Sequence, residues 1–397
     1  MKILVCNVGS TSLKYQLRTT DAPQSILARG GAERVGQKEG VFYTTDPKSG
    51  KKESVSAVFP THLEAIQRML DALCPAEIDS INEIDCVAFK VVHAKGVTGT
   101  QFLTDDVLAA MEAFNAVAPA HNPPYLAAIR LFRKLLPDTP MIGAFETAFH
   151  ANMPAEASRY SIPAALSKEH AIHRYGFHGA SHEYLSRLAI EKLDRPQTKI
   201  VTCHLGGSGS ICAVRDGISV DTSMGLSLQC GVMHNNRCGD IDPYIIFYLV
   251  EECGMTLAEV KTMLQTKSGF LGMTDGLSGD LRDVEAAAKQ GNEDAEIAIR
   301  SYAYSIRKYI GSYAAAMGGL DAVVFGGGIG TNSPLVRRLA LKDLEFLGIA
   351  IDPGKNERGE EDISCADSPV RVYLTETDEE QIVAEKAAAL LAERAEK

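Results

Sequence analysis

The sequence predicts an α/β fold made of two lobes, and three observations support it. Apolar segments of strand length alternate with segments of helical periodicity along the chain, which is typical of α/β proteins. At 397 residues the chain is longer than a single simple core supports. One local pattern also occurs twice, about half the chain apart, so we expect each lobe to carry one copy.

The repeated pattern is an apolar strand that runs into a turn rich in glycine and serine. The first copy spans residues 3–14 and the second spans residues 200–211. Such turns expose backbone N–H groups and hydroxyls, and they leave room for a phosphate to approach closely. One copy alone is more simply an ordinary turn. The two copies, with the later cluster Gly326–Gly330, leave phosphate-binding hairpins and plain turns as equal alternatives at this point.

The first half of the chain contains the segments of the first lobe. We expect a hairpin at 1–18, helices at 61–73, 104–114 and 122–136, and strands at 86–92 and 141–149. Thr104 can cap its helix, and Pro123 suits the first turn of the next one. The last strand would deliver Glu146 near its C-terminal end.

The second half repeats the alternation. We expect strands at 199–205, 210–215, 218–222, 321–325 and 371–374, and helices at 242–252, 256–266, 286–317, from 332 onward and at 379–392. Pro154 and Pro163 interrupt the pattern, which places the boundary between about residues 148 and 165. The predicted lobes are residues 1–150, joined by the C-terminal helix 380–397, and residues 151–379.

Composition narrows the class of protein. A net charge of −11 argues against nucleic acid as the main partner. The longest apolar run, 244–250, is far shorter than a membrane span, and Met1 leads directly into a strand without a signal peptide. The nine cysteines include no Cys-x-x-Cys, which favours free thiols over disulfides or zinc. We therefore expect a cytoplasmic protein.

Other phosphate and metal signatures fit less well. No Gly-x4-Gly-Lys-Ser/Thr motif occurs, and Thr331 stands where a dinucleotide motif needs its third glycine. His178 and His182, with Cys203 and His204, could suggest a transition-metal site, but the glycines around His178 argue against a straight helix there. Magnesium held by one or two carboxylates and by nucleotide phosphates is favoured instead.

Polar side chains gather at predicted strand ends and glycine turns. His121 precedes a helix N-terminus, His178 lies between glycines, His204 ends a strand and Arg237 lies in a polar loop. Each alone is explained by a structural hydrogen bond or ion pair. Together at such positions they favour a site for an anionic ligand.

At this point the sequence resembles the acetate kinase family, within the sugar kinase/Hsp70/actin superfamily. The resemblance runs the whole chain. The matching motifs, in the order of the family, are Asn7–Lys14, Val91–His93, Ala120–Pro124, Thr147–His150, Arg174–His182, His204–Gly206, Asp221–Gly225, Arg237–Pro243, Gly328–Pro334 and Asp378–Glu380.

The resemblance implies a two-lobed, duplicated ribonuclease-H-like (actin-like ATPase) fold. It implies that the active site lies in the cleft between the lobes and that the second lobe binds the nucleotide. It implies reversible in-line transfer of the ATP γ-phosphoryl group to acetate or another short carboxylate, giving an acyl phosphate. The expected cofactor is Mg²⁺ or Mn²⁺, with ATP as co-substrate. The expected partners are the small carboxylate and ATP/ADP, with no nucleic acid and no membrane, and the chain is expected to form a homodimer.

The resemblance also implies roles for individual residues. The implied catalytic residues are Lys90, His121, Glu146, His178 and Arg237. The implied acceptor pocket is Lys90, Val92, Ala120, Phe177 and Leu228. The implied nucleotide and phosphate contacts are Ser10, Ser12, Lys14, His204, Leu205, Gly206, Gly207, Ser208, Asp280, Leu281, Arg282, Gly328, Ile329, Gly330, Thr331 and Asn332. Asn7 and Glu379 would help to hold the metal.

Several positions depart from the family pattern. The family has arginine at Lys90, and lysine keeps the charge but loses the bidentate fork. The family has aspartate at Glu146, and glutamate extends the carboxylate by one methylene. Asparagine and glutamate stand in the family at Gly207 and Thr331. The acceptor pocket also changes, because Ala120 replaces leucine and Leu228 replaces proline.

Two accounts of these departures compete. Lys90 and Glu146 could compensate one another around a different acceptor, or the site could bind nucleotide without efficient transfer. Charge is kept at both positions, whereas simple decay would more often leave a neutral residue. The sequence therefore favours a working kinase over a catalytically weak nucleotide-binding protein.

Overall fold

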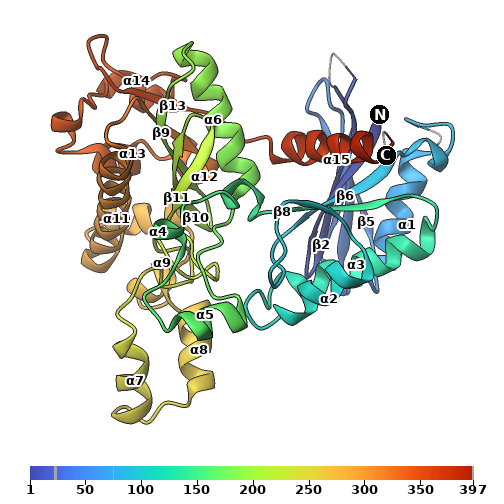
Figure 1. Ribbon diagram of the computed structural model, residues 1–397, viewed down its shortest axis with the longest axis horizontal. Coiled ribbons are helices and arrows are strands. Elements are labelled where there is room, and N and C mark those ends of the chain that lie inside the picture. Colours follow the sequence, from blue (N-terminus) through green and yellow to red (C-terminus); the bar gives the residue numbers. More distant parts are fainter. Residues whose placement is uncertain (22–24, 75, 396–397) are drawn as a thin grey trace. The chain divides into compact units, whose positions relative to one another are not determined.

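The structure, a computed structural model, describes residues 1–21, 25–74 and 76–395 (Figure 1). The chain divides into two compact units, Met1–Ala148 with Asp378–Lys397, and Phe149–Thr377. Residues 396–397 of the expected C-terminal helix lie outside the described part. None of the helices in the described residues is both long and apolar enough to cross a membrane.

The first unit is built on an eight-stranded sheet in the order β5-β4-β3-β2-β1-β6-β8-β7. The strands are β1 Lys2–Gly9, β2 Ser12–Thr19, β3 Ser25–Glu33, β4 Gly40–Thr45, β5 Lys52–Ala57, β6 Cys86–Val91, β7 Thr100–Phe102 and β8 Met141–Phe145. β1 runs parallel to β6, and β6 runs parallel to β8. The remaining neighbours pair antiparallel.

Helices cover both faces of this sheet. They are α1 His62–Leu73, α2 Asp105–Ala113, α3 Asn122–Leu135 and α15 Glu379–Ala395. Strand side chains alternate between faces, so Ala88 packs with Val383 of α15 while the neighbouring Phe89 meets the ring of Phe132 on α3. As a result α15 returns from the end of the sequence to complete the core of the first unit.

The second unit contains a five-stranded sheet in the order β11-β10-β9-β12-β13. Its strands are β9 Lys199–Leu205, β10 Gly209–Arg215, β11 Ile218–Thr222, β12 Ala322–Gly326 and β13 Arg371–Leu374. Helix α6 (Gly179–Leu193) packs Leu185 and Ala189 on one face, and α11 (Glu293–Met317) packs on the other. The remaining helices are α4 Ala155–Ser158, α5 Ala164–His170, α7 Tyr244–Glu251, α8 Leu257–Thr266, α9 Gly269–Met273, α10 Leu281–Lys289, α12 Gly327–Asn332, α13 Pro334–Leu341 and α14 Pro353–Arg358.

The two sheets repeat one topology. In each sheet, three strands that are consecutive in sequence pair antiparallel. Beyond the first of these strands, on its free side, two later strands follow in parallel, which gives the orders β3-β2-β1-β6-β8 and β11-β10-β9-β12-β13. The predicted duplication and α/β class are therefore confirmed. The sheet of the first unit extends further, through β4 and β5 at one edge and β7 at the other.

Two expectations about local structure are wrong, and one short helix was not expected. The helix expected at 286–317 is two helices, because Gly291 has a φ of +90° and Asn292 caps α11 through the backbone N–H of Ala295. The strand expected at 141–149 ends at Phe145, one residue before Glu146. The glycine cluster after β12 forms the short helix α12, an element that the sequence did not single out.

The expectation around His178 needs a finer correction. Gly176 has a φ of +74° and His178 a φ of +57°, so the chain is not helical at these residues. Helix α6 begins at the next residue, Gly179, and it contains His182. The non-helical conformation therefore lies immediately before a regular helix and does not interrupt it.

Candidate active site

The first glycine/serine hairpin holds two predicted residues side by side. Asn7 on β1 pairs with Lys14 on β2, and Gly9 pairs with Ser12. A Cβ atom at Gly9 would lie 2.6 Å from Ser12 Oγ, so glycine keeps this turn tight. A small cavity of about 120 Å³ is lined by Asn7, Lys14 and Arg29, among others. Ser10 is exposed at the turn itself.

Lys90 contacts two carboxylates of the first unit. Its Nζ donates to Glu379 Oε2 at 2.6 Å and lies 3.4 Å from Glu146 Oε1. The three side chains are only 17%, 13% and 8% exposed. Burial alone would lower the pKa of Lys90, but Glu379 and Glu146 together raise it well above its ordinary value. The side chain is therefore a permanently charged ammonium between two carboxylates.

Asn7 and Glu379 have the chemistry that a magnesium ion requires. Both offer hard oxygen donors, and Mg²⁺ usually takes only one or two protein carboxylates, with phosphates and water completing its shell. Tyr125, on α3, donates its hydroxyl to Asn7 Oδ1 at 2.9 Å. The tyrosine therefore orients a predicted metal ligand, a role that sequence reasoning missed. Its only sequence signal is its place in the first turn of the Asn122 helix.

The other predicted residues of the first unit lie around α3. His121 is the residue before that helix, and its side chain does not cap it. Ala120 is exposed and Val92 is buried at the end of β6. Asn122, which was not predicted, ties the start of α3 to the backbone by donating to His93 O and Met111 O at 2.9 and 2.8 Å.

In the second unit a chain of hydrogen bonds ends at His178. Ser210 Oγ lies 2.8 Å from His178 Nδ1 and 2.7 Å from His182 Nε2, while His182 Nδ1 lies 2.7 Å from Thr202 Oγ1. Burial holds the pKa of His182 well below its ordinary value, so this ring is neutral. His204 lies beside His178, with ring centroids 4.3 Å apart. The left-handed backbone of His178 is a conformation that side chains rarely adopt and that often marks functional sites.

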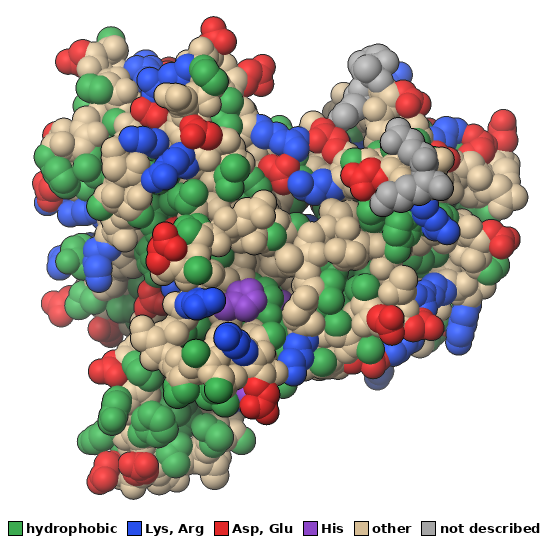
Figure 2. Space-filling view, viewed as in Figure 1, with side chains coloured by type: hydrophobic (Ala, Val, Ile, Leu, Met, Phe, Trp, Pro, Cys, Tyr) green, Lys and Arg blue, Asp and Glu red, His purple; other side chains and the backbone are tan. Residues whose placement is uncertain are grey.

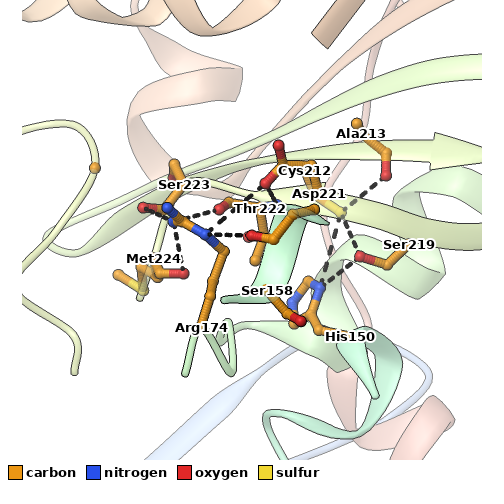
Figure 3. A network of polar contacts seen from close by, with 12 residues as sticks. His150, Ser158, Arg174, Cys212, Ala213, Ser219, Asp221, Thr222, Ser223 and Met224 are labelled. Atoms are coloured by element: carbon orange, nitrogen blue, oxygen red, sulfur yellow. Dashed lines mark hydrogen bonds and ion pairs between the residues drawn. The ribbon is translucent and has the colours of Figure 1, made fainter. Parts of the chain in front are cut away.

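A second polar network joins His150 and Arg174 to β11 and the residues that follow it (Figure 3). Arg174 donates to the carbonyl oxygens of Thr222 and Ser223 at 2.8 and 3.2 Å. His150 bonds Ser219 Oγ at 2.8 Å and the carbonyl oxygen of Phe177 at 2.9 Å. Burial lowers the pKa of His150 to about 4, so it acts as a neutral hydrogen-bonding group. Phe177, predicted for the acceptor pocket, is fully buried.

Arg237 and Leu228 are brought together by one hydrogen bond. Arg237 Nη1 donates to the carbonyl oxygen of Leu228 at 2.7 Å. Nearby, His234 is buried, and Arg237 adds to the effect of burial in lowering its pKa to about 3. This hydrogen bond holds the Arg237 guanidinium against the segment that contains Leu228, a residue predicted for the acceptor pocket.

The second unit holds a cavity of about 530 Å³ beside the second glycine turn. Its volume lies in the range of small-molecule sites. Predicted residues in its lining are Gly206, Gly207, Asp280, Leu281, Arg282, Gly328, Ile329 and Asn332. Residues that the sequence did not single out are Asn235, Glu285 and Ser333. Four segments far apart in sequence therefore enclose one cavity.

Three further predicted nucleotide contacts of this unit, Leu205, Gly330 and Thr331, are not part of that lining. Leu205 and Gly330 are buried, and Thr331 donates its hydroxyl to the carbonyl oxygen of Gly327 at 3.0 Å. Arg337, also not predicted, is almost fully buried and donates to the carbonyl oxygens of Gly330 and Thr331, both at 2.9 Å. Arg337 thus holds the C-terminal part of α12, the helix that contributes Gly328, Ile329 and Asn332 to the cavity lining.

The described part of the chain contains no group of three or more His, Cys, Asp or Glu residues placed to hold a metal ion. His178 and His182 instead share Ser210 as a hydrogen-bond partner. The histidine pair therefore serves the protein's own polar network.

Comparison with known proteins decides the family. Residues 2–385 match the model of the Acetokinase family. The chain belongs to this family. Among its members, the acetate kinase of Geobacillus kaustophilus is 44% identical over 389 residues, which cover 96% of this chain and 97% of that protein. The acetate kinase of Thermoanaerobacterium thermosaccharolyticum is 44% identical over 393 residues, 97% of each chain.

Two solved structures of related kinases share the fold. The acetate kinase of Porphyromonas gingivalis superposes with a TM-score of 0.88 at 38% identity, covering 98% of this chain and 99% of its own. A propionate kinase from Francisella tularensis superposes with a TM-score of 0.89 at 33% identity, covering 97% of this chain and 98% of its own. The resemblance inferred from the motifs is confirmed.

Proposed function

We propose that this protein transfers the γ-phosphoryl group of ATP to acetate, giving acetyl phosphate and ADP, and that it catalyses the reverse reaction. An oxygen of the acetate carboxylate forms the new P–O bond while the bond from the γ-phosphorus to the ADP oxygen breaks. The observation that carries the proposal is the 530 Å³ cavity, which joins the glycine turn at 206–207 to α12 in an acetokinase.

The proposed nucleotide position follows from this cavity. Gly206 and Gly207 would form the turn that faces the phosphates. Gly207 would offer its backbone N–H, because the N–H of Gly206 already donates to the carbonyl oxygen of Ser208 at 3.0 Å. His204, Ser208 and, from the first hairpin, Lys14 with Ser10 and Ser12 would add further contacts. The adenosine would lie against Asp280–Arg282 and Gly328–Asn332. A Cβ atom at Gly328 would meet nothing within 4 Å, so the glycine leaves open space there. That space favours ATP over a bare polyphosphate donor.

The catalytic roles follow from charge and position. Arg237 and His178 would stabilise the charge of the transferred phosphoryl group, and both are held in place by hydrogen bonds. Lys90 and Glu146 would position the acceptor, with His121 lining the site. Val92, Ala120, Phe177 and Leu228 would contact the acyl group. Asn7 and Glu379 would hold Mg²⁺, which neutralises phosphate charge when bound.

A second candidate is a kinase of another small carboxylic acid. It is motivated by Lys90 and Glu146, which replace arginine and aspartate, and by Ala120, which replaces a larger leucine. A smaller side chain leaves room for a longer acyl group. The alternative of a weak nucleotide-binding protein has less support, because the buried Lys90 keeps both carboxylate partners.

A hydroxamate assay tests these proposals. Purified protein is incubated with ATP, Mg²⁺ and a panel of formate, acetate, propionate and butyrate, and the acyl phosphate is trapped with hydroxylamine. We expect acetate to give the highest kcat/KM. A higher value for propionate or butyrate would support the second candidate. Nucleotide binding without acyl phosphate from any acid would refute both and leave the weak nucleotide-binding protein.

We also propose that the protein is a cytoplasmic homodimer, whose second copy covers α7 and α8. Tyr244, Phe247 and Tyr248 on α7 and Leu257 on α8 are 52–75% exposed. Figure 2 shows apolar side chains gathered over these helices. Such an apolar patch marks an interaction surface. Light scattering after gel filtration should give twice the mass of the 42.8 kDa chain, and Phe247→Glu with Tyr248→Glu should give a monomer.

A further inference from the structure

Asn235 lies beside the glycine that departs from the family in the phosphate turn. The family has asparagine at position 207, where this chain has glycine. A Cβ atom at Gly207 would lie 3.1 Å from Nδ2 and 3.6 Å from Cγ of Asn235. The carboxamide of Asn235 therefore occupies space into which a side chain at 207 would extend. Both residues line the 530 Å³ cavity.

The backbone holds Asn235 firmly at this place. Its N–H donates to the carbonyl oxygen of Gly207 at 3.1 Å, and its carbonyl oxygen accepts from Leu271 N at 2.9 Å. On another side, a Cβ atom at Gly279 would lie 3.4 Å from Asn235 Cβ and 3.0 Å from its carbonyl oxygen. Asn235 thus lies between Gly207 and Gly279, which have no side chains that would occupy its space. The hydrogen bonds that hold it in place come from its backbone, so they should persist when its side chain is replaced.

The carboxamide itself is free to bind a ligand. Within the described residues the structure shows no hydrogen bond from the side chain of Asn235 to the rest of the chain. A carboxamide supplies two N–H donors as well as an acceptor. A half-buried amide on the wall of a cavity, next to a glycine turn, is suited to donate to an anionic oxygen.

We propose that Asn235 is a nucleotide-binding residue, whose carboxamide donates to a phosphate oxygen and supplies from the facing loop the amide that the family carries at position 207. The inference rests on the proposed nucleotide site but not on the identity of the acceptor acid. It predicts that an asparagine works at 207 or at 235, and that both together are too crowded. Gly207→Asn alone should therefore be harmful, although the φ of Gly207 does not lie in the left-handed region.

Direct binding of ADP and of a non-hydrolysable ATP analogue, each with Mg²⁺ and without any carboxylate, tests the proposal by calorimetry. Asn235→Ala should weaken binding about tenfold, the loss expected for one hydrogen bond to a charged group. Asn235→Gly and Gly207→Asn should each bind weakly, and the double variant should return to within about twofold of wild type. Asn236→Ala, at the exposed neighbouring residue, is the matched control and should bind as wild type.

Two results would overturn the proposal: wild-type affinity in Asn235→Ala, or a double variant no tighter than Asn235→Gly. Should the double variant fail to fold, Asn235→Asp decides, because it keeps the shape but places a carboxylate against phosphate. We expect it to bind more weakly than Asn235→Ala, and equal or tighter binding would refute the proposal. The binding experiment contains no carboxylate acceptor, so its result does not depend on acyl transfer. A protein that forms no acyl phosphate would therefore refute the proposed activity but not the proposed role of Asn235. In the kinase assay, Asn235→Ala should raise KM for ATP while KM for the acid stays unchanged.

Discussion

Lys90 Nζ donates to Glu379 Oε2 at 2.6 Å, which links a strand of the first unit to the first residue of the C-terminal helix α15. The two residues are 289 positions apart in sequence. The same ammonium lies 3.4 Å from Glu146. The Lys90 ammonium therefore stabilises the carboxylates of Glu146 and Glu379. Without it, these two largely buried negative charges would repel each other.

Removing the Lys90 ammonium should destabilise the protein. Lys90→Met leaves Glu146 and Glu379 without their cation, and we expect the free energy of unfolding to fall by roughly 2 kcal/mol, somewhat below the loss for a fully buried pair. Urea unfolding at pH 7 measures it. The exposed pair of Lys51 and Glu53 is the control, since Lys51→Met should leave stability unchanged. Equal effects of the two substitutions would contradict the expectation.

Lys90 and Glu146 should behave as a coupled pair in catalysis. Lys90→Arg puts a longer side chain against a longer carboxylate, and Glu146→Asp withdraws the carboxylate from the ammonium. A misplacement of about 1 Å can reduce the rate about 100-fold. We expect each single variant to lower kcat/KM for the best acid by about tenfold or more, and the double variant to lose less than the two losses combined.

The double variant also reports on specificity. A large gain on acetate with a loss on another acid would show that Lys90 and Glu146 shift the choice of acceptor. Strictly additive losses in kcat/KM would show that Lys90 and Glu146 are not coupled.

Acid should destabilise the protein partly through His150. Its pKa is about 4 in the folded state and near 6.5 when unfolded, so the unfolded state binds the proton more readily between these values. The stability contributed by the neutral ring is complete above pH 6.5 and is lost as the pH falls toward 4, up to about 3 kcal/mol. His150→Gln should flatten this dependence in urea unfolding between pH 4.5 and 7.5. The exposed His170→Gln should leave it unaltered, and a steep acid loss that persists in His150→Gln would contradict the assignment.

A side chain at position 328 should block nucleotide binding without harming the fold. A Cβ atom there meets nothing within 4 Å, and Gly328 lines the cavity. We expect Gly328→Leu to raise KM for ATP by about tenfold or more, while Tm stays within a few degrees of wild type. Gly311→Leu on α11 is the matched control, since it also has open space but lies outside the cavity lining. An unchanged KM in Gly328→Leu would place the nucleotide elsewhere.

Local signals in the sequence were sufficient for most individual elements. Thr104 caps α2, Thr256 caps α8, and the antiparallel hairpins form where the glycine/serine turns predicted them. These features depend on neighbours in the chain, so they can be recognised from residue types alone. The break at Gly291-Asn292 carried a similar signal, which the apolar periodicity on both sides obscured.

The sequence by itself determined the α/β class, the duplication and the residue types of a phosphate site, because these follow from periodicity and from motifs within a few residues. Only the tertiary structure decided which residues meet. Lys90 reaches Glu379 through the return of α15, Tyr125 orients Asn7, and Asn235 fills the space beside Gly207. Such contacts join segments distant in sequence, and packing and buried charge, rather than local propensity, determine them.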